Sequence, residues 1–146
     1  MPDVSVLVYA INPDSRHHTV ARHWLEGGYR DPAGVGFAWA AVTGFLRIST
    51  LHRILPKALS IADALRFVDE WLSHPRAQIL EPTDRHAALL GRLLIGAGHG
   101  GNLVSDAHLA AIAIEHGATL GSFDVDFERF AGLRFEHLVA DAVHER

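Results

Sequence analysis

The chain of 146 residues contains no cysteine. This absence excludes disulfide scaffolds, cysteine-ligated zinc or iron–sulfur sites and thiol nucleophiles, and it is compatible with a reducing cytoplasm. A long hydrophobic run is also missing, since the longest uncharged stretch, residues 33–46, is too short and too interrupted by glycine to cross a bilayer. The N-terminal residues MPDVSVLVYA lack the basic region of a signal peptide. We therefore expect a soluble, non-secreted, cytoplasmic protein with no membrane partner.

Positive charge is in slight deficit, with a net charge of −4, which does not favour indiscriminate binding to polyanions. Acidic residues are absent between residues 32 and 62, a segment that contains Arg47, Arg53 and Lys57. Hydrophobic residues make up 49% of the chain and charged residues 21%, which is enough apolar material for a core. Length and composition predict one domain over residues 1–146.

Short apolar runs alternate with helical patterns, which predicts an α/β, Rossmann-like three-layer domain (α/β/α) with a central, mostly parallel sheet. The expected strands cover residues 34–38, 77–80, 119–122 and 134–137. The first three expected helices cover residues 14–26, ending at Gly27–Gly28, residues 39–51, and the segment from Ser60 to before Pro75. Two more begin at caps: one runs from Thr83 or Asp84 to about residue 94, and the other from Asn102 to Gly117. A helical turn is expected at residues 125–130. Propensity alone makes residues 4–11 a strand.

Four aspartates lie at the boundaries of these elements. Asp3 precedes a strongly apolar run, Asp106 lies in the first turn of a helix, and Asp124 and Asp126 follow a predicted strand. Each has an ordinary alternative: Asp3 at a solvated terminus, Asp106 stabilising a helix dipole, and Asp124 as a helix cap. Helix starts and the carboxyl ends of parallel strands meet at one crevice, so we expect these carboxylates to converge there.

A converging set of carboxylates raises the local negative charge and calls for a positive partner. Mg²⁺ and Mn²⁺ are suitable because hard cations prefer carboxylate oxygens, and such clusters form the metal sites of phosphoryl-transfer enzymes. Rival signals are weaker. The eleven histidines contain no HExxH spacing, and we interpret His17, His18 and His23 as a solvated helix face. No GxSxG nucleophile motif is present.

Four segments together resemble a known family. They are DVSVLVYA at 3–10, GFLRIST at 44–50, NLVSDAHLAAIA at 102–113 and SFDVDF at 122–127. In this order they resemble the PIN-domain ribonucleases, with the VapC toxins of bacterial toxin–antitoxin pairs as the most similar group. The resemblance extends from Asp3 to about Arg134, and the ordered set of four is more specific than any one segment.

The resemblance implies residue roles. Asp3, Asp106 and Asp124 match the acidic metal-binding positions of the family, and Asp126 matches a further acidic position. Ser122 and Ser5 match small polar residues that support this site. The family fold is a central parallel sheet flanked by helices, usually in a homodimer, and it makes residues 4–11 mostly a short helix, which we adopt. Its members cleave RNA with Mg²⁺ or Mn²⁺, and a cognate VapB antitoxin blocks the acidic groove.

The chain departs from the family pattern in two places. Many PIN domains have a glutamate in the segment that here reads TGFLR, where this chain has Gly44. The loss of a ligand is expected to weaken the metal site or to shift its role to Asp126 or water. In addition, only Met1 and Pro2 precede Asp3, so either the first strand is very short or the true start codon lies upstream.

We therefore expect a metal-dependent endoribonuclease of the VapC type, with Asp3, Asp106, Asp124 and Asp126 as catalytic residues and Arg47 as a candidate for contact with RNA phosphates. The alternative for Arg47 is a structural ion pair. The rival function is a catalytically weak or inactive PIN-like module that binds RNA or an antitoxin. A small nucleotide phosphatase is a third hypothesis.

Overall fold

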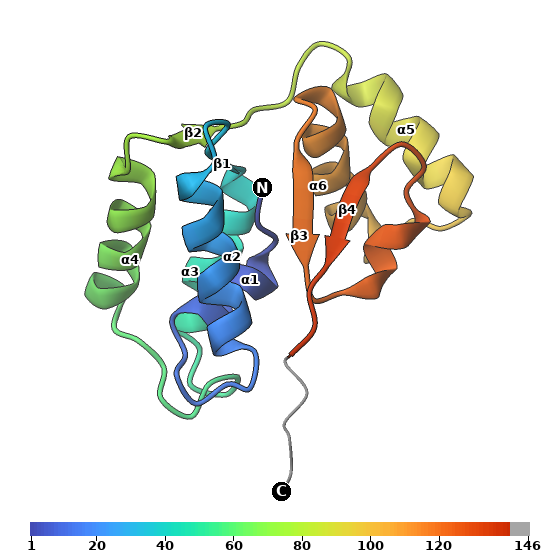
Figure 1. The fold of residues 1–146 in the computed structure, drawn as a ribbon. Helices are drawn as coiled ribbons and strands as arrows, with labels where there is room; N and C mark the ends of the chain where they lie inside the picture. Colours follow the sequence, from blue (N-terminus) through green and yellow to red (C-terminus); the bar gives the residue numbers. More distant parts are fainter. Residues whose placement is uncertain (141–146) are drawn as a thin grey trace, which may run out of the picture.

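The computed structural model describes residues 1–140, in which pairs of consecutive helices are separated by single strands (Figure 1). The elements are α1 (Val4–Ala10), α2 (His18–Arg30), β1 (Val35–Phe37), α3 (Trp39–Ser49), α4 (Ile61–Ser73), β2 (Ala77–Ile79), α5 (His86–Ala97), α6 (Leu103–Glu115), β3 (Thr119–Ser122), the 3-10 helix η1 (Val125–Arg129) and β4 (Arg134–His137). The predicted α/β class is confirmed, and residues 4–10 are helical, as the family resemblance implied and propensity did not.

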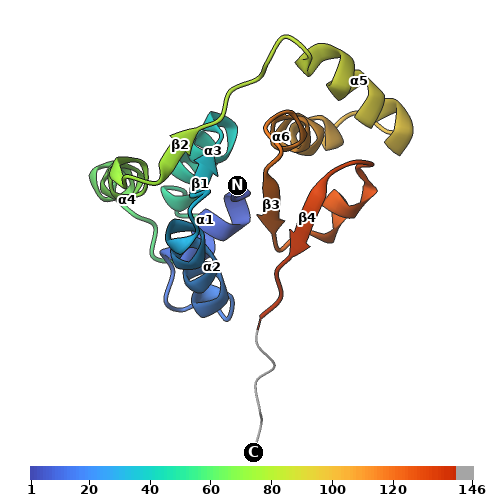
Figure 2. The same cartoon turned by 45° about the horizontal axis from the view of Figure 1, so that its top comes forward.

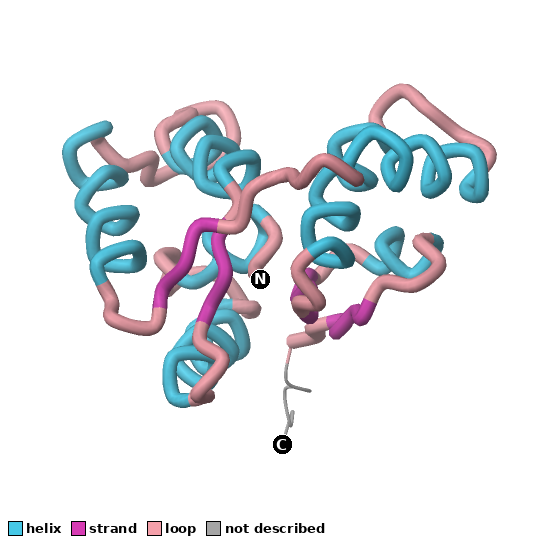
Figure 3. The backbone as a smooth tube through the Cα atoms, turned by 90° about the horizontal axis from the view of Figure 1, so that it is seen from above, coloured by secondary structure: helices cyan, strands magenta, loops and turns pink. Residues whose placement is uncertain are grey.

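The strands pair in parallel, as predicted. β1 pairs with β2 and β3 pairs with β4, and within residues 1–140 these are two separate two-stranded sheets. The N-terminal segment lies between the two pairs (Figures 1 and 3), and one bridge, Pro2 to Gly121, joins it to β3. The segment is too short for a full strand, because α1 begins at Val4 and proline has no amide hydrogen to donate.

Two helices differ from their predicted bounds. α2 starts at His18 and continues through Gly27 and Gly28 to Arg30. It passes the glycines because its last turn is held from outside: the Tyr29 hydroxyl donates to the Trp71 carbonyl over 2.8 Å and the Arg76 guanidinium donates to the Arg30 carbonyl over 2.8 Å. α5 starts at His86 and is not capped by a side chain of Thr83 or Asp84. The Asn102 side chain also makes no capping hydrogen bond.

The apolar core lies where helices α1, α3 and α6 meet the strands. α1 packs on both α2 and α3, and α5 packs along α6 (Figure 2). α6 is apolar on nearly all sides and is therefore largely buried. The largest fully buried side chains are those of Phe37, Phe45, Phe127, Leu7, Ile112 and Leu120. This core holds the starts of α1 and α6 next to the end of β3.

A buried polar network joins α5 to α6. The fully buried Glu115 carboxylate accepts hydrogen bonds from the Thr83 amide over 3.0 Å and from His86 Nδ1 over 2.7 Å. Because His86 Nδ1 donates, its Nε2 accepts from His108 Nδ1, 2.8 Å away, in the neutral form of both rings. Burial raises the pKa of Glu115, but the bonds from Thr83 and His86 outweigh it and lower the net pKa.

We expect His86→Leu to lower the free energy of unfolding by about 2 kcal/mol, because it leaves a buried carboxylate short of a donor. The matched control is Arg66→Ala, which removes an exposed ion pair to Asp63 (3.0 Å) and is expected to cost less than about 1 kcal/mol. Urea unfolding measures both. The contribution of the ionised Glu115 to folding stability is fully present at a pH above the ordinary carboxyl pKa. It is lost as the pH falls through the lowered pKa of Glu115 in the folded protein. Equal effects of the two variants would contradict this account.

Candidate active site

Asp3 and Ser122 meet where the start of α1 lies beside the end of β3. The Asp3 amide donates to the Gly121 carbonyl over 2.9 Å, which fixes the backbone of Asp3 against the strand. The Ser122 hydroxyl, fully buried, donates to Asp3 Oδ2 over 2.7 Å, and the Ser5 hydroxyl donates to the same oxygen over 3.3 Å. Both serines therefore lie against the Asp3 carboxylate.

Asp124 and Asp126 follow β3 at the start of η1. Asp124 Oδ1 accepts a hydrogen bond from the Asp126 amide over 2.9 Å, so Asp124 is a helix cap in the ordinary sense. The Asp124 amide in turn donates to the Ser122 hydroxyl over 3.0 Å, which connects it to Asp3. Asp126 makes an exposed ion pair with Arg129 over 3.4 Å. One oxygen of Asp124 remains outside the capping bond.

Asp106 lies in the first turn of α6, within electrostatic range of Asp3, Asp124 and Asp126. Burial raises the pKa of Asp106 to about 6, and the negative charges of Asp3, Asp124 and Asp126 add to the rise. The pKa of Asp3 is also raised, chiefly by burial and to a smaller extent by Asp124, against hydrogen bonds from Ser122, the Val4 backbone and Ser5. The structure therefore brings the four predicted acids close enough for mutual repulsion.

The four carboxylates do not form a closed metal cage. Among residues 1–140, no group of three or more His, Cys, Asp or Glu side chains is placed to hold a metal ion directly. The donor chemistry nevertheless fits a hydrated divalent cation, since Mg²⁺ keeps several waters and needs only one or two carboxylates. A bound cation would offset the repulsion between Asp106 and the three neighbouring acids. The side chains fit Mg²⁺ or Mn²⁺ held partly through water.

Gly44 lies where α3 crosses α1. A Cβ atom at this position would come 2.7 Å from Cγ2 of Val4, the residue after Asp3. The close approach of the two helices therefore depends on glycine, and a larger side chain requires Val4 to move. The absence of the family glutamate is in this way coupled to the packing that positions Asp3.

Arg47 lies exposed in the last turn of α3. Among residues 1–140 Arg47 makes no ion pair, so the described structure does not support the alternative that Arg47 is part of a structural ion pair. Arg53 is also exposed. Both side chains are available for contact with a polyanion.

His17 was predicted to lie on a solvated helix face, and this is wrong. Its ring packs 4.6 Å from both Tyr9 and Phe123, and its Nδ1 is buried without a hydrogen-bond partner. His18 Nδ1 also bonds the Tyr9 carbonyl over 2.9 Å, whereas His23 is exposed. Tyr9 and Phe123 stand out in the sequence as aromatic residues inside the family segments at 3–10 and 122–127.

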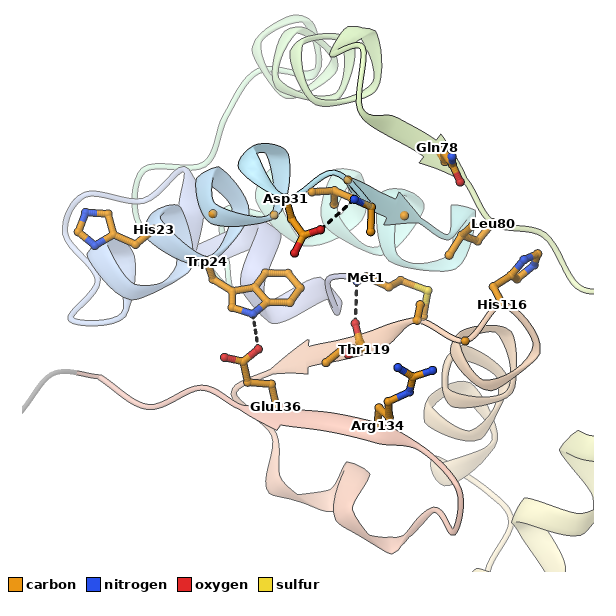
Figure 4. Close-up of a pocket in the computed structure, with 18 residues that line it drawn as sticks. Met1, His23, Trp24, Asp31, Gln78, Leu80, His116, Thr119, Arg134 and Glu136 are labelled. Carbon is orange, nitrogen blue, oxygen red and sulfur yellow. Dashed lines mark hydrogen bonds between the residues drawn. The ribbon is translucent and has the colours of Figure 1, made fainter.

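A cavity of about 640 Å³ lies elsewhere, between the two sheets and near the start of β3 (Figure 4). Trp24, whose indole donates to Glu136 over 2.9 Å, and the amino group of Met1, bonded to the Thr119 carbonyl over 2.8 Å, project toward it. Since Thr119 begins β3 and Ser122 ends it, the cavity is at the opposite end of the strand from the acids. None of the predicted site residues lines it.

We expect Gly44→Glu to lower the free energy of unfolding by about 1–3 kcal/mol, because the side chain must displace Val4. The matched control is Gly91→Glu in α5, where an added Cβ meets nothing within 4 Å, and we expect no loss there. Addition of Val4→Ala to Gly44→Glu should recover part of the loss. Urea unfolding of the three variants decides the matter, and a Gly44→Glu protein as stable as the parent would refute the packing argument.

Comparison with known proteins identifies the family. The PIN domain family model matches residues 1–133. Ribonuclease VapC37 of Mycobacterium tuberculosis is 44% identical over 134 residues, covering 92% of this chain and 93% of that protein. Ribonuclease VapC33 of the same species is 37% identical over 135 residues, covering 92% and 94%.

A solved structure shares the fold. The crystal structure of VapBC2 from Rickettsia felis bound to a DNA fragment from its promoter superposes with a TM-score of 0.68 at 23% identity, covering 93% of this chain and 96% of that one. Within residues 1–140 the structure has no helix long and apolar enough to span a membrane. PIN-domain ribonucleases generally depend on divalent metal ions. On the family match and the identity to its relatives, the chain belongs to the PIN-domain family, among the VapC ribonucleases.

Proposed function

We propose that the chain hydrolyses RNA phosphodiester bonds at the site formed by Asp3, Asp106, Asp124 and Asp126, with Mg²⁺ or Mn²⁺ as cofactor. The chain is a ribonuclease of the VapC type, the toxin component of a VapBC toxin–antitoxin pair. The observation that carries the site assignment is the convergence of Asp106, at the start of α6, on the acids at the start of α1 and the end of β3, whose charges together with burial raise the pKa of Asp106 to about 6. Such clusters of perturbed carboxylates are typical of functional sites.

Asp3, Asp106 and Asp124 would hold the cation, partly through water molecules, and Asp126 would position a ligand or a water. A bound divalent cation lowers the pKa of water and stabilises the charge that develops on the phosphate. Ser122 and Ser5 keep Asp3 oriented through their hydrogen bonds. The water oxygen forms a bond to phosphorus, the bond from phosphorus to the 3′ oxygen breaks, and that oxygen takes a proton. The products are a 5′-phosphate and a 3′-hydroxyl.

The partners follow from the same assignment. RNA is the substrate, and Arg47 contacts its phosphates from the acid-free segment 32–62. A cognate VapB-type antitoxin inhibits the enzyme, two copies of the chain form a homodimer, and residues 1–146 act as one PIN domain in the cytoplasm. The family membership and the exposure of Arg47 support these assignments.

We expect the purified chain to cut total bacterial RNA into discrete fragments with Mg²⁺ or Mn²⁺ and not with EDTA. Asp106→Asn should lower the cleavage rate at least ~100-fold with its fold unchanged, because it removes a charged ligand. Asp69→Asn, on the exposed face of α4, is the matched control and should cleave like the parent. Full activity of Asp106→Asn would refute the site. No cleavage by a folded, antitoxin-free parent would favour the inactive RNA-binding or antitoxin-binding module.

Charge repulsion at Asp106 also predicts a response to metal. Since the pKa of Asp106 is raised to about 6, its deprotonation costs stability as the pH rises from about 4 to 6 and the full cost remains at pH 7. In the absence of metal, Asp106→Asn should therefore raise the free energy of unfolding at pH 7 by on the order of 1 kcal/mol, after allowance for solvent screening. This corresponds to a rise in Tm of about 3–5 °C. Mg²⁺ should raise the Tm of the parent and have less effect on the variant. Equal responses to Mg²⁺ would count against metal binding at Asp106.

A further inference from the structure

Three aromatic side chains from separate parts of the chain form a cluster beside the acidic site. Tyr9 comes from α1, His17 precedes α2, and Phe123 follows β3. Tyr9 and Phe123 pack edge to face with ring centroids 5.1 Å apart, and His17 lies 4.6 Å from each. All three residues are half-buried. We call them the aromatic cluster.

The aromatic cluster is connected to the catalytic residues through the backbone. Phe123 lies between Ser122 and Asp124, and its amide donates to the Ser5 hydroxyl over 3.3 Å. Tyr9 is four residues after Ser5 on α1, so the two share one face of the helix. The backbone therefore connects the aromatic cluster to the residues around Asp3 and Asp124.

The environment of His17 determines which nitrogen can donate. Nδ1 is buried and has no partner among residues 1–140, so a proton there would be a buried donor without an acceptor. Burial, and after it Arg16, lowers the pKa of His17, which keeps the ring neutral. The proton then lies on Nε2. Neither Nε2 nor the Tyr9 hydroxyl is among the buried unpartnered atoms of the described chain, and neither has a hydrogen bond there, so both reach solvent.

A structural role alone does not account for this imidazole. A leucine would fill the space between Tyr9 and Phe123 without an unpaired buried nitrogen, which costs about 1–3 kcal/mol. The exposed Nε2–H beside two aromatic rings supplies a donor and a stacking surface at once. The neighbouring Arg16 is exposed and forms no ion pair within residues 1–140, which adds positive charge at this place.

We propose that Tyr9, His17 and Phe123 bind one nucleotide of the RNA next to the cleaved phosphate, with the base packed on the rings and His17 Nε2 donating to it. Arg16 lies at the side for the adjoining phosphate. The proposal rests on the proposed ribonuclease function and deepens it. Stacking of a base on an aromatic side chain tolerates many sequences, because each base has a π face, so the aromatic cluster contributes affinity more than sequence choice.

The test measures RNA binding without cleavage. In the Asp106→Asn background with Mg²⁺, fluorescence anisotropy follows the Kd for labelled single-stranded oligouridine and oligoadenine. His17→Ala removes ring and donor, His17→Phe keeps the ring, and His17→Gln keeps a donor. His23→Ala, an exposed histidine of α2 that lines the cavity at the other end of β3, is the matched control. Circular dichroism and the Tm check that each variant is folded.

We expect His17→Ala to raise the Kd about tenfold for both RNAs, as the loss of one stacked base predicts, with smaller increases for His17→Phe and His17→Gln. His23→Ala should bind like its parent. An unchanged Kd in the three folded His17 variants overturns the proposal and leaves the ribonuclease assignment intact. If His17→Ala unfolds, the Phe and Gln variants decide. Both this proposal and the proposed ribonuclease function would be overturned if the Asp106→Asn protein bound neither RNA and the unmutated chain did not cleave total RNA.

Discussion

The short contact between the N-terminal residues and β3 positions the rest of the site. Backbone hydrogen bonds of 2.9–3.0 Å link Gly121 to Met1 and to Asp3. These backbone bonds alone are enough to place Asp3 beside Ser122. α1 starts at the next residue, so the direction of the helix and the position of its first acid are set together. The same strand end carries Asp124 and Phe123, and thus both the acids and the aromatic cluster depend on this pairing.

Two acidic side chains, the fully buried Glu115 and the half-buried Asp106, have opposite surroundings. Glu115 is fully buried and accepts bonds from Thr83 and His86, so its negative charge is satisfied and its pKa is lowered. Asp106 receives no such compensation from the described residues, and its neighbours are three further acids. The first arrangement holds α5 on α6. The second stores repulsion at the place where a cation and an RNA phosphate would meet.

Gly44 shows how packing and ligand choice compete at one position. α3 approaches α1 so closely that a Cβ atom on Gly44 would lie only 2.7 Å from Cγ2 of Val4, so the chain combines a tight helix crossing with the absence of an acid. The remaining four aspartates then carry the negative charge of the site without a fifth carboxylate. In the proposed metal site, Asp126 and water would take the place of the family glutamate.

The sequence by itself determined the α/β class, the order of the elements and the four acids, because periodicity, element boundaries and the ordered segments are local properties. The family resemblance also singled out Ser5 and Ser122 as polar residues near the acids in sequence. Only the tertiary structure decided that α2 runs through Gly27 and Gly28, since Arg76 and Trp71 hold its end from distant segments. The same holds for His17, whose ring is shielded by Tyr9 and Phe123 from other elements. A local pattern does not contain the contacts that bury one nitrogen of a histidine and expose the other.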